Sequence, residues 1–246
     1  MSKRFRNPKM WDFIVSNGKN QYEKSGFYNS FTGDAFSDIE MKELSDNLFE
    51  KIKPYLAPEK TALEIGCASG LTMFRLYPLL KHYIGTDMSK NAINYDQKYV
   101  NDNNIKNITL INCAADEIDQ HIDFKPDIAI LNSVCQYFPD TDYLISVIKK
   151  LTKILTDNGI IYFGDIMDLS KKETLRKKLI DHQKNNPSFK LMVNIDEELF
   201  LPKSFFTDLP NVISDIKSVD ISDKAGTIDN ELKLYRYDII AKLGEK

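Results

Sequence analysis

The sequence predicts an α/β fold with a doubly wound, mostly parallel sheet of seven strands, helices on both faces and a helical cap at the N-terminus. Two observations predict it. From residue 61 onward, short apolar runs alternate with longer amphipathic stretches, a pattern typical of βαβ units. The chain has 246 residues, of which 42% are hydrophobic and 28% charged, so one globular domain with an accessory layer is expected.

Residues 1–60 are expected to form the N-terminal helical cap and lid. The first 33 residues are polar with scattered aromatic side chains, which indicates short helices and loops. Over 38–55 the apolar residues recur at helical spacing, and Pro54 is expected to end that helix.

Residues 61–246 are expected to form one structural unit around the sheet. Its first five strands are predicted at 61–65, 83–86, 108–112, 127–131 and 160–163, and its helices at 71–80, 89–101, 143–155 and 171–184. The turn signal Asp157-Asn158-Gly159 precedes the fifth strand. Two final strands, 212–221 and 234–243, are predicted to pair as a hairpin at one edge of the sheet.

Composition disfavours several classes of function. Lys and Arg total 33 against 36 Asp and Glu, and this net charge of −3 disfavours a nucleic-acid binder. No run of about 18 apolar residues occurs, so no membrane span is expected. The basic start lacks a following apolar stretch and does not resemble a secretory signal, so a cytoplasmic protein is expected. Three widely spaced cysteines and three scattered histidines predict neither disulfides nor a metal site.

The most informative segment is the loop after the first strand, Glu64-Ile65-Gly66-Cys67-Ala68-Ser69-Gly70. In a doubly wound sheet, ligands bind beyond the carboxyl ends of the strands, and small loop residues let the backbone approach them. The spacing Glu-x-Gly-x-x-x-Gly differs from the Gly-x-Gly-x-x-Gly of dinucleotide sites, and a carboxylate beside a diphosphate is repulsive. Glu64 therefore favours a ligand that carries an amino group.

Asp87 ends the second strand, about twenty residues further on, where an acidic side chain can accept hydrogen bonds from ribose hydroxyls. Taken singly, Glu64 could be a solvated strand end and Asp87 a helix N-cap. Their matched positions at two strand ends favour ligand binding for the pair.

Glu64-x-Gly66-x-x-x-Gly70 followed by Asp87 resembles the class I methyltransferases, which use S-adenosylmethionine and have a Rossmann-like fold. In that family the loop holds the methionine part of the cofactor and the second acid binds its ribose. Ala68 stands where many members have glycine. In that family the adenine lies against the loop after the third strand, which implies contacts from Ala115 and Asp116, although Asp116 could instead cap the segment that follows it. The resemblance implies S-adenosylmethionine as the cofactor, held by Glu64, Gly66, Cys67, Ala68, Gly70, Asp87, Met88, Ala115, Asp116, Asn132 and Ser133.

Two further strings narrow the resemblance: Asn132-Ser133-Val134-Cys135-Gln136-Tyr137-Phe138-Pro139 and Asn230-Glu231-Leu232-Lys233-Leu234-Tyr235-Arg236-Tyr237. With them, residues 26–243 look like the N-methyltransferase domains of nonribosomal peptide synthetases. Phe31 replaces a common tyrosine and Met167 a common arginine of that family. Both departures concern the acceptor pocket rather than the cofactor site.

The closer resemblance implies an acceptor site. Gln136, Tyr137 and Asn132 are expected to be catalytic, with Gln136 accepting a hydrogen bond from an amine and Tyr137 packing beside the methyl group. Strand alternation would put Tyr235 and Tyr237 on one face and Arg236 on the other, and which face meets the pocket stays open. The residues expected to bind substrate are Tyr28, Phe31, Asp165, Tyr235 and Tyr237.

The expected function is methyl transfer from S-adenosylmethionine to an amine of an amino acid, or of a peptidyl or carrier-bound intermediate, in nonribosomal-peptide-type biosynthesis. No histidine falls at a motif, and carbon acceptors usually need a base, so nitrogen or oxygen is favoured over carbon. The alternatives are an O- or C-methyltransferase of a free small metabolite and a non-catalytic cofactor-binding partner of a synthetase.

The expected partners follow from that function. A free-standing protein is expected, which serves a synthetase or carrier protein in trans or acts on a small molecule, with neither nucleic acid nor membrane as partner. The basic run over 171–178 favours a solvated helix face, and docking of an acidic carrier protein is the alternative.

Overall fold

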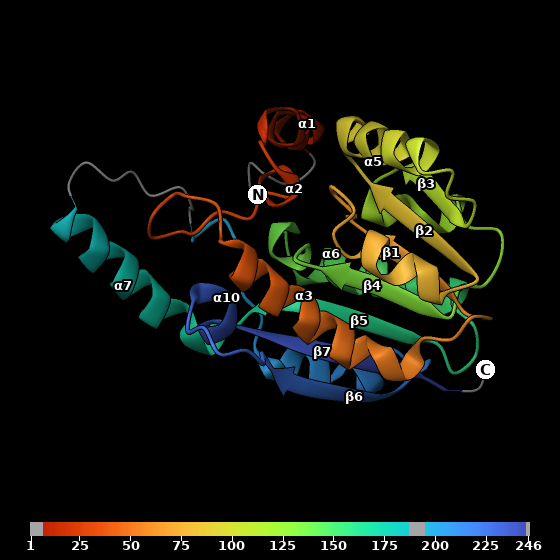
Figure 1. The fold of residues 1–246 in the computed structure, drawn as a ribbon. Helices are drawn as coiled ribbons and strands as arrows, with labels where there is room; N and C mark the ends of the chain where they lie inside the picture. Colours follow the sequence, from red (N-terminus) through yellow and green to blue (C-terminus); the bar gives the residue numbers. More distant parts are fainter. Residues whose placement is uncertain (1–6, 187–194, 245–246) are drawn as a thin grey trace.

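The computed structural model describes residues 7–186 and 195–244. They form a seven-stranded sheet in the order β3-β2-β1-β4-β5-β7-β6 (Figure 1). The first five strands pair in parallel, and β7 is antiparallel to both β5 and β6. The predicted fold class and the antiparallel pair at one edge are therefore confirmed. The strands are β1 (Thr61–Ile65), β2 (His82–Asp87), β3 (Ile108–Asn112), β4 (Ile128–Asn132), β5 (Ile160–Met167), β6 (Ile216–Asp223) and β7 (Arg236–Leu243).

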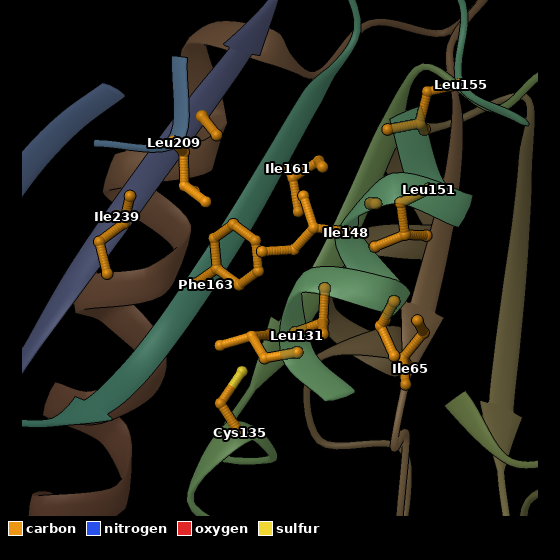
Figure 2. Close-up of a cluster of buried hydrophobic side chains, with 14 of the residues drawn as sticks. Ile65, Leu131, Cys135, Ile148, Leu151, Leu155, Ile161, Phe163, Leu209 and Ile239 are labelled. Carbon is orange, nitrogen blue, oxygen red and sulfur yellow. The ribbon is translucent and has the colours of Figure 1, made fainter. Parts of the chain in front are cut away.

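The two faces of the sheet carry separate apolar cores, because successive strand residues point to opposite sides. One core packs Leu131, Ile161 and Phe163 against Ile148 and Leu151 of helix α6 (Thr141–Ile154), as Figure 2 shows. The opposite face packs residues such as Ile130 and Tyr162 against α3 (Asp38–Ile52) and α4 (Met73–Leu76). Both faces are covered, as the doubly wound prediction requires.

Local signals define the ends of the longer helices. Ser37 and Glu40 form a capping box at the start of α3, and Ser89 caps α5 (Lys90–Asp102) by accepting a hydrogen bond from the Ala92 N–H. The charged helix predicted over 171–184 is α7 (Lys172–Asn185), and it projects from the body of the molecule (Figure 1).

Four predicted boundaries are wrong. Strand β5, predicted over 160–163, continues to Met167, beyond a register shift between Phe163 and Ile166 in its pairing with β7. The helix predicted over 71–80 is only α4 followed by a 3-10 turn, Tyr77–Leu79, because Pro78 cannot donate the next helical hydrogen bond. Strand β6 starts at Ile216, since 209–212 form the short helix α9 (Leu209–Val212) after α8 (Lys203–Thr207). Strand β7 starts at Arg236, since Asn230 caps another short helix, α10 (Glu231–Leu234).

The N-terminal residues form two helices above the sheet, α1 (Pro8–Asn17) and α2 (Gln21–Lys24). Figure 1 shows α1 beside α5, at the end of the sheet where the parallel strands terminate. Among the described helices, none has both the length and the apolar character needed to cross a membrane.

Candidate functional site

A cavity of about 370 Å³ lies at the carboxyl ends of the parallel strands. It is bounded by the glycine loop, by the loops after β2, β3 and β4, and by parts of α1, α2 and α3. Ten residues that the sequence assigns to the site lie on its wall: Glu64, Gly66, Cys67, Ala68, Asp87, Met88, Ala115, Asn132, Ser133 and Tyr137.

The glycine loop brings main chain to the cavity wall. Gly66 has a φ of +76°, and a Cβ there would lie 2.5 Å from Cγ2 of Val134. Ala68 also has a positive φ of 50°, which explains why glycine suits this position. The loop therefore forms a cradle that larger side chains at Gly66 would fill.

Glu64 lies on this wall with only 2% of its surface exposed. The Tyr83 hydroxyl donates a hydrogen bond of 2.9 Å to its carboxylate. Burial raises the pKa of Glu64 to about 8, against the lowering effect of the hydrogen bonds from Tyr83 and Thr72. Glu64 is therefore not a solvated strand end, but a buried acid that a bound cation would ionise.

Asp87 organises the loop beside it. Its two carboxylate oxygens accept hydrogen bonds from the backbone N–H groups of Ala68, at 3.0 Å, and Ser89, at 2.7 Å. Ser89 caps the following helix, so Asp87 is not the N-cap. Burial raises the pKa of Asp87 to about 6.

A third carboxyl group, that of Asp96 on α5, lies behind the loop and is fully buried. Among the described residues its one hydrogen-bonding neighbour is the weakly donating thiol of Cys67. Its Oδ1 would be 3.1 Å from a Cβ at Gly70. Burial, with a smaller contribution from the neighbouring acids Glu64 and Asp87, raises the pKa of Asp96 to about 9. No ion pair reaches any of these three acids within 7–186 and 195–244, so the site favours a cationic ligand.

Asn132 ends β4 on the cavity wall. Its buried Oδ1 has no donor in the described part of the chain, and a Cβ at Gly164 of the adjacent strand would lie only 2.1 Å from it. Gly164 therefore makes room for the Asn132 side chain. An unsatisfied buried carbonyl at a cavity wall is suited to accept an N–H from a bound molecule.

The other end of the cavity is lined by Met88 and by Ala115 in the loop after β3. Tyr143 of α6 also lies there, and its hydroxyl donates to Asp116 at 2.9 Å. Asp116 itself is not part of the wall. Asp116 therefore contacts Tyr143, a wall residue, and its expected contact with the adenine stays a prediction.

Tyr137 and Gln136 lie in the short 3-10 helix after β4 (Cys135–Tyr137). Tyr137 is on the wall and meets the edge of Trp11 with ring centroids 4.8 Å apart. Gln136 is buried behind the wall at 3% exposure, and its Oε1 has no partner within the described ranges. Its catalytic role stays a prediction.

The predicted substrate-binding residues and Gly70 lie off the wall of this cavity. Tyr28 makes a bridge with Ala35, and Phe31 packs with the apolar cluster under α7. Tyr235 precedes β7 and joins the same cluster. Tyr237 is instead buried in the apolar core on the face of the sheet that α6 covers. The expected sharing of one strand face by the two tyrosines is wrong, because α10 displaces Tyr235 from the strand.

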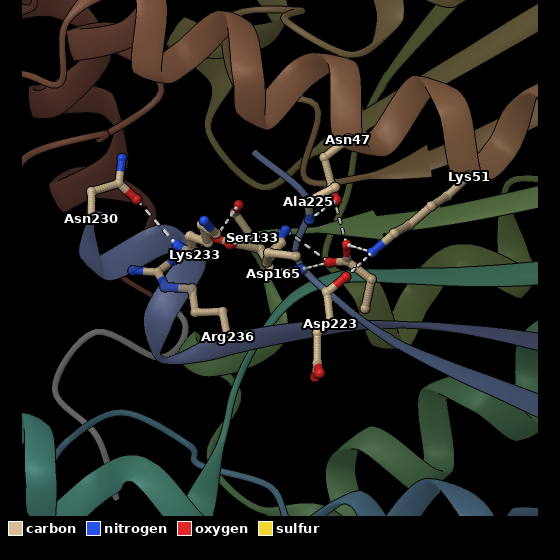
Figure 3. Close-up of polar contacts among 11 residues, drawn as sticks. Asn47, Lys51, Ser133, Asp165, Asp223, Ala225, Asn230, Lys233 and Arg236 are labelled. Atoms are coloured by element: carbon tan, nitrogen blue, oxygen red, sulfur yellow. Dashed lines mark hydrogen bonds and ion pairs between the residues drawn. The ribbon is translucent and has the colours of Figure 1, made fainter. Parts of the chain in front are cut away.

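Asp165 sits in a buried ionic network that borders the site (Figure 3). Its carboxylate accepts from Ser133 Oγ at 2.8 Å and pairs with Arg236 and with Lys224, whose Nζ is 3.2 Å away. Burial alone would raise the pKa of Asp165, but Arg236 and Lys224 lower it. Asp165 is therefore held as a charged structural group behind Ser133.

Asp238 extends this network to α3. It pairs with Lys224 at 2.8 Å and with Lys51 at 2.7 Å, and Asn47 donates to it at 2.6 Å. Burial would raise the pKa of Asp238, but the two lysines hold it at about 2. Neither Asp165 nor Asp238 is therefore free to remove a proton.

Part of the cavity wall comes from residues 1–60, where a cap and lid are expected, but the individual side chains that line it were not predicted. The cavity is also lined by Trp11, Gln21, Tyr22, Ser25, Phe27 and Met41. Trp11, Tyr22 and Phe27 belong to the scattered aromatic residues of this segment, but no spacing rule links any of the six to the strand ends. Their contribution comes from tertiary packing of the cap.

These features fit S-adenosylmethionine. The cradle at Gly66 and the buried acid Glu64 suit a charged amino-acid moiety, and Asp87 suits a ribose.

Comparison with known proteins agrees with this fit. Residues 56–229, well over half of the chain, match the family described as methyltransferase domain. The chain belongs to this family. The methyltransferase uses S-adenosylmethionine as its cofactor.

The methyltransferase is similar to segments of nonribosomal peptide synthetases. It is 29% identical over 246 residues to chondramide synthase cmdD of Chondromyces crocatus, a match that covers 96% of this chain and 6% of the synthase. It is also 29% identical over 237 residues to the bassianolide nonribosomal cyclodepsipeptide synthetase of Beauveria bassiana, covering 92% of this chain and 7% of that enzyme. The chain thus spans a small part of the curated relatives it matches.

Solved structures share the fold. The N-methyltransferase NodS from Bradyrhizobium japonicum, in complex with S-adenosyl-L-homocysteine, superposes with a TM-score of 0.62 at 16% identity, covering 96% of this chain and 97% of that one. The CurJ carbon methyltransferase superposes with a TM-score of 0.63 at 14% identity, covering 97% and 61%. At these identities the likeness concerns the fold alone.

Proposed function

We propose that this methyltransferase transfers a methyl group to an amine of an amino acid, or of a peptidyl or carrier-bound intermediate, in natural-product biosynthesis of the nonribosomal peptide type. When bound, S-adenosylmethionine supplies an electrophilic methyl group on a sulfonium. The protein then has to position an acceptor and exclude water.

The cofactor contacts divide between two ends of the cavity. Asp87 would accept from the ribose hydroxyls, and Met88, Ala115 and Tyr143 would enclose the base. Glu64 would be ionised by the ammonium group of the methionine moiety, since an opposite charge favours the charged form of a buried acid.

The observation that carries the choice of nitrogen is the lack of a free base on the cavity wall. The wall carboxyl groups among the described residues, Glu64 and Asp87, are assigned to the cofactor, and no histidine lines the cavity there. Asp165 and Asp238 are neutralised by lysine and arginine side chains. A neutral amine needs no base before attack, because it loses its proton after the methyl group has been transferred, whereas a carbon acid must first be ionised.

The acceptor is proposed to lie between Asn132 and Tyr137. The unsatisfied Oδ1 of Asn132 can accept one N–H of the amine and so aim its lone pair. Tyr137 offers an aromatic ring that tolerates the positive charge of the methylated product. Gln136 is proposed to support this arrangement from behind the wall.

The synthetase relatives support the pathway class. Similarity over most of this chain to segments of two nonribosomal peptide synthetases favours an aminoacyl or peptidyl amine as acceptor. A synthetase or carrier protein acting in trans is the partner proposed on the same grounds.

The proposal is tested by incubating the protein with methyl-labelled S-adenosylmethionine and four acceptor classes: free amino acids, aminoacyl-carrier thioesters, phenols and β-keto thioesters. Label on the nitrogen of either amine class is expected, with a rate that rises with pH as the acceptor's ammonium deprotonates and then levels off. Label only on oxygen or carbon would favour the alternative methyltransferases. Cofactor binding without transfer to any class would favour a non-catalytic partner.

The acceptor assignment is tested separately with variants. Asn132→Ala and Gln136→Ala should each lower turnover while the affinity for S-adenosylhomocysteine changes less than turnover does. Asn101→Ala, at the far end of α5, serves as the control. Wild-type turnover in both site variants would remove this pair from the acceptor site.

A further inference from the structure

Ser133 and Asp165 have an uncommon backbone conformation on two neighbouring strands. Ser133 directly follows β4 and has a φ of +57°, and Asp165 lies near the end of β5 and has a φ of +66°. Residues with a side chain adopt this left-handed region at a cost in free energy, so it persists where the surrounding contacts require it. Two such residues on paired strands indicate a constraint at this edge of the sheet.

A hydrogen bond joins the two side chains (Figure 3). The Ser133 hydroxyl donates to Oδ2 of Asp165 at 2.8 Å, and the same oxygen pairs with Arg236. Asp165 is fully buried, and Nζ of Lys224 lies 3.2 Å from its other oxygen. Although burial opposes it, Arg236 and Lys224 hold the pKa of Asp165 below its ordinary value. Asp165 therefore stays ionised, and an ionised carboxylate can only accept hydrogen bonds.

The ionised carboxylate fixes the direction of the Ser133 hydroxyl. A serine hydroxyl has one proton and two lone pairs, and here the proton is donated to Asp165. Ser133 lines the cavity, and within 7–186 and 195–244 no group donates a hydrogen bond to its oxygen. The lone pairs of Ser133 Oγ are therefore left to accept an N–H from a molecule in the cavity.

The preceding residue supplies a second acceptor. Asn132 lines the same cavity, and its Oδ1 is buried without a donor in the described part of the chain. An amine that attacks a methyl group points its lone pair at that group, so its N–H bonds point away from it. A primary amine can offer one N–H to each oxygen, whereas a secondary amine has a single N–H and must turn a carbon toward one of them. An acceptor that faces carbon stays unsatisfied, which costs free energy.

We propose that Asp165 is a positioning residue that acts through Ser133, and that Asn132 and Ser133 together select primary over secondary amines as methyl acceptors. Ser133 then serves the acceptor, in place of the cofactor contact that the resemblance implies. Asp165 itself lies off the cavity wall, and its role is to keep the serine proton out of the cavity. The inference rests on the amine acceptor proposed above and specifies its class.

The test compares amino acids with their own N-methyl derivatives. Alanine, valine and phenylalanine, free and as carrier thioesters, are each paired with the N-methyl form, and kcat/KM is measured with methyl-labelled S-adenosylmethionine. Wild-type protein should prefer the primary amine. Ser133→Ala should lower kcat/KM for the primary amine about fivefold, because one hydrogen bond is lost, without lowering it for the secondary amine. Calorimetry should find the affinity for S-adenosylhomocysteine unchanged.

A second variant at the same position separates the hydroxyl from the backbone. Ser133→Gly removes the hydroxyl but relieves the left-handed conformation, since glycine adopts a positive φ readily. If the hydroxyl selects the amine, this variant should lose selectivity to the same extent as Ser133→Ala. If Ser133 matters only for its backbone, Ser133→Gly should keep the wild-type selectivity.

The role of Asp165 is tested with Asp165→Asn. Its amide can donate an N–H to Ser133 and so free the serine proton to enter the cavity, which should lower the selectivity for primary amines. Asp238→Asn is the matched control, because Asp238 is equally buried and pairs with the same Lys224 but is not a hydrogen-bond partner of Ser133. It should keep the wild-type selectivity, since a ratio of two rates from one preparation does not depend on the folded fraction.

Unchanged selectivity in both Ser133 variants would overturn the assignment, as would equal losses in Asp165→Asn and Asp238→Asn. A large loss of affinity for S-adenosylhomocysteine in Ser133→Ala would place Ser133 at the cofactor and overturn it too. Wild-type protein that labels both amine classes equally would contradict the selection while the proposed function stands. Label on no amine would overturn the proposed function and this inference with it.

Discussion

Glu64 has opposite effects on folding and on ligand binding. Its pKa is raised to about 8 in the ligand-free protein, from an ordinary value of 4.5. The unfolded chain therefore releases this proton at lower pH than the folded one. The contribution of Glu64 to stability is full below about 4.5 and is lost as the pH rises through about 8.

Glu64→Gln is therefore expected to stabilise the ligand-free protein and to weaken cofactor binding. The free energy of unfolding at pH 8 should increase by roughly 1–3 kcal/mol, with a smaller gain at pH 5, because no buried charge forms. Urea unfolding at the two pH values and calorimetry with S-adenosylhomocysteine measure both effects. A variant that is less stable at pH 8 and binds with wild-type affinity would contradict this role.

Asp87 is expected to contribute affinity through hydrogen bonds to the ribose. Asp87→Ala should raise the dissociation constant for S-adenosylhomocysteine at least tenfold, since a hydrogen bond to a charged acceptor contributes about 1.5–3 kcal/mol. Asp102→Ala is a matched control, because Asp102 is an exposed acid at the other end of α5 that pairs with Lys98. Calorimetry that finds the same affinity in both variants would remove Asp87 from the site.

At the scale of elements, the buried ionic network fixes α3 and the β5–β7 pair behind the cavity. Asp238 on β7 receives Lys51 and Asn47 from α3, and its remaining oxygen binds Lys224 and the Asp165 N–H. Asp165 has a positive φ of 66°, where β5 and β7 shift register. The network holds this irregular strand end in place next to Ser133.

Asp238→Asn is expected to lower the free energy of unfolding by roughly 3–5 kcal/mol at neutral pH, because it leaves buried cationic groups without their partner. The matched control is Asp220→Asn on the neighbouring strand β6, whose surface ion pair with Lys242 of β7 should contribute about 0–1 kcal/mol. Equal losses in the two variants would contradict the account of the network.

Asp238 is also expected to account for part of the loss of folding stability in acid. Asp238 has a pKa of about 2 in the fold and 3.8 ordinarily, so its stabilisation is complete above about 3.8 and is lost as the pH falls through about 2. Thermal melting from pH 5 to pH 2 should show a smaller loss in Asp238→Asn than in wild type. A parallel decline in both proteins would exclude this contribution.

At the scale of the whole molecule, the sequence was sufficient to predict the sheet and the strand ends that line the cavity. Strands β1 and β3 have the predicted bounds. Strand β1 is buried along its whole length, whereas β3 is a partly exposed edge strand whose short apolar run still marks its limits. Glu64, Asp87 and Asn132 could be located because parallel strands bring their carboxyl ends to one edge.

The rest depends on packing that periodicity does not encode. Trp11 reaches the wall only because α1 docks on α5, a contact between segments far apart in the sequence. Tyr235 left its predicted strand because Asn230 begins a short helix just before it. Gln136 lies behind the wall, while its neighbour Tyr137 lies on it, because a single 3-10 turn points adjacent side chains in different directions.

The central claim is that this cavity brings S-adenosylmethionine to an amine. The most direct measurement is mass spectrometry of the products formed from methyl-labelled S-adenosylmethionine and paired acceptors that offer an amine, a phenol or an activated carbon. Label is expected on nitrogen, together with equimolar S-adenosylhomocysteine, and Asp87→Ala should form no product at low cofactor concentration. Label confined to oxygen or carbon, with the amines unchanged, would contradict it.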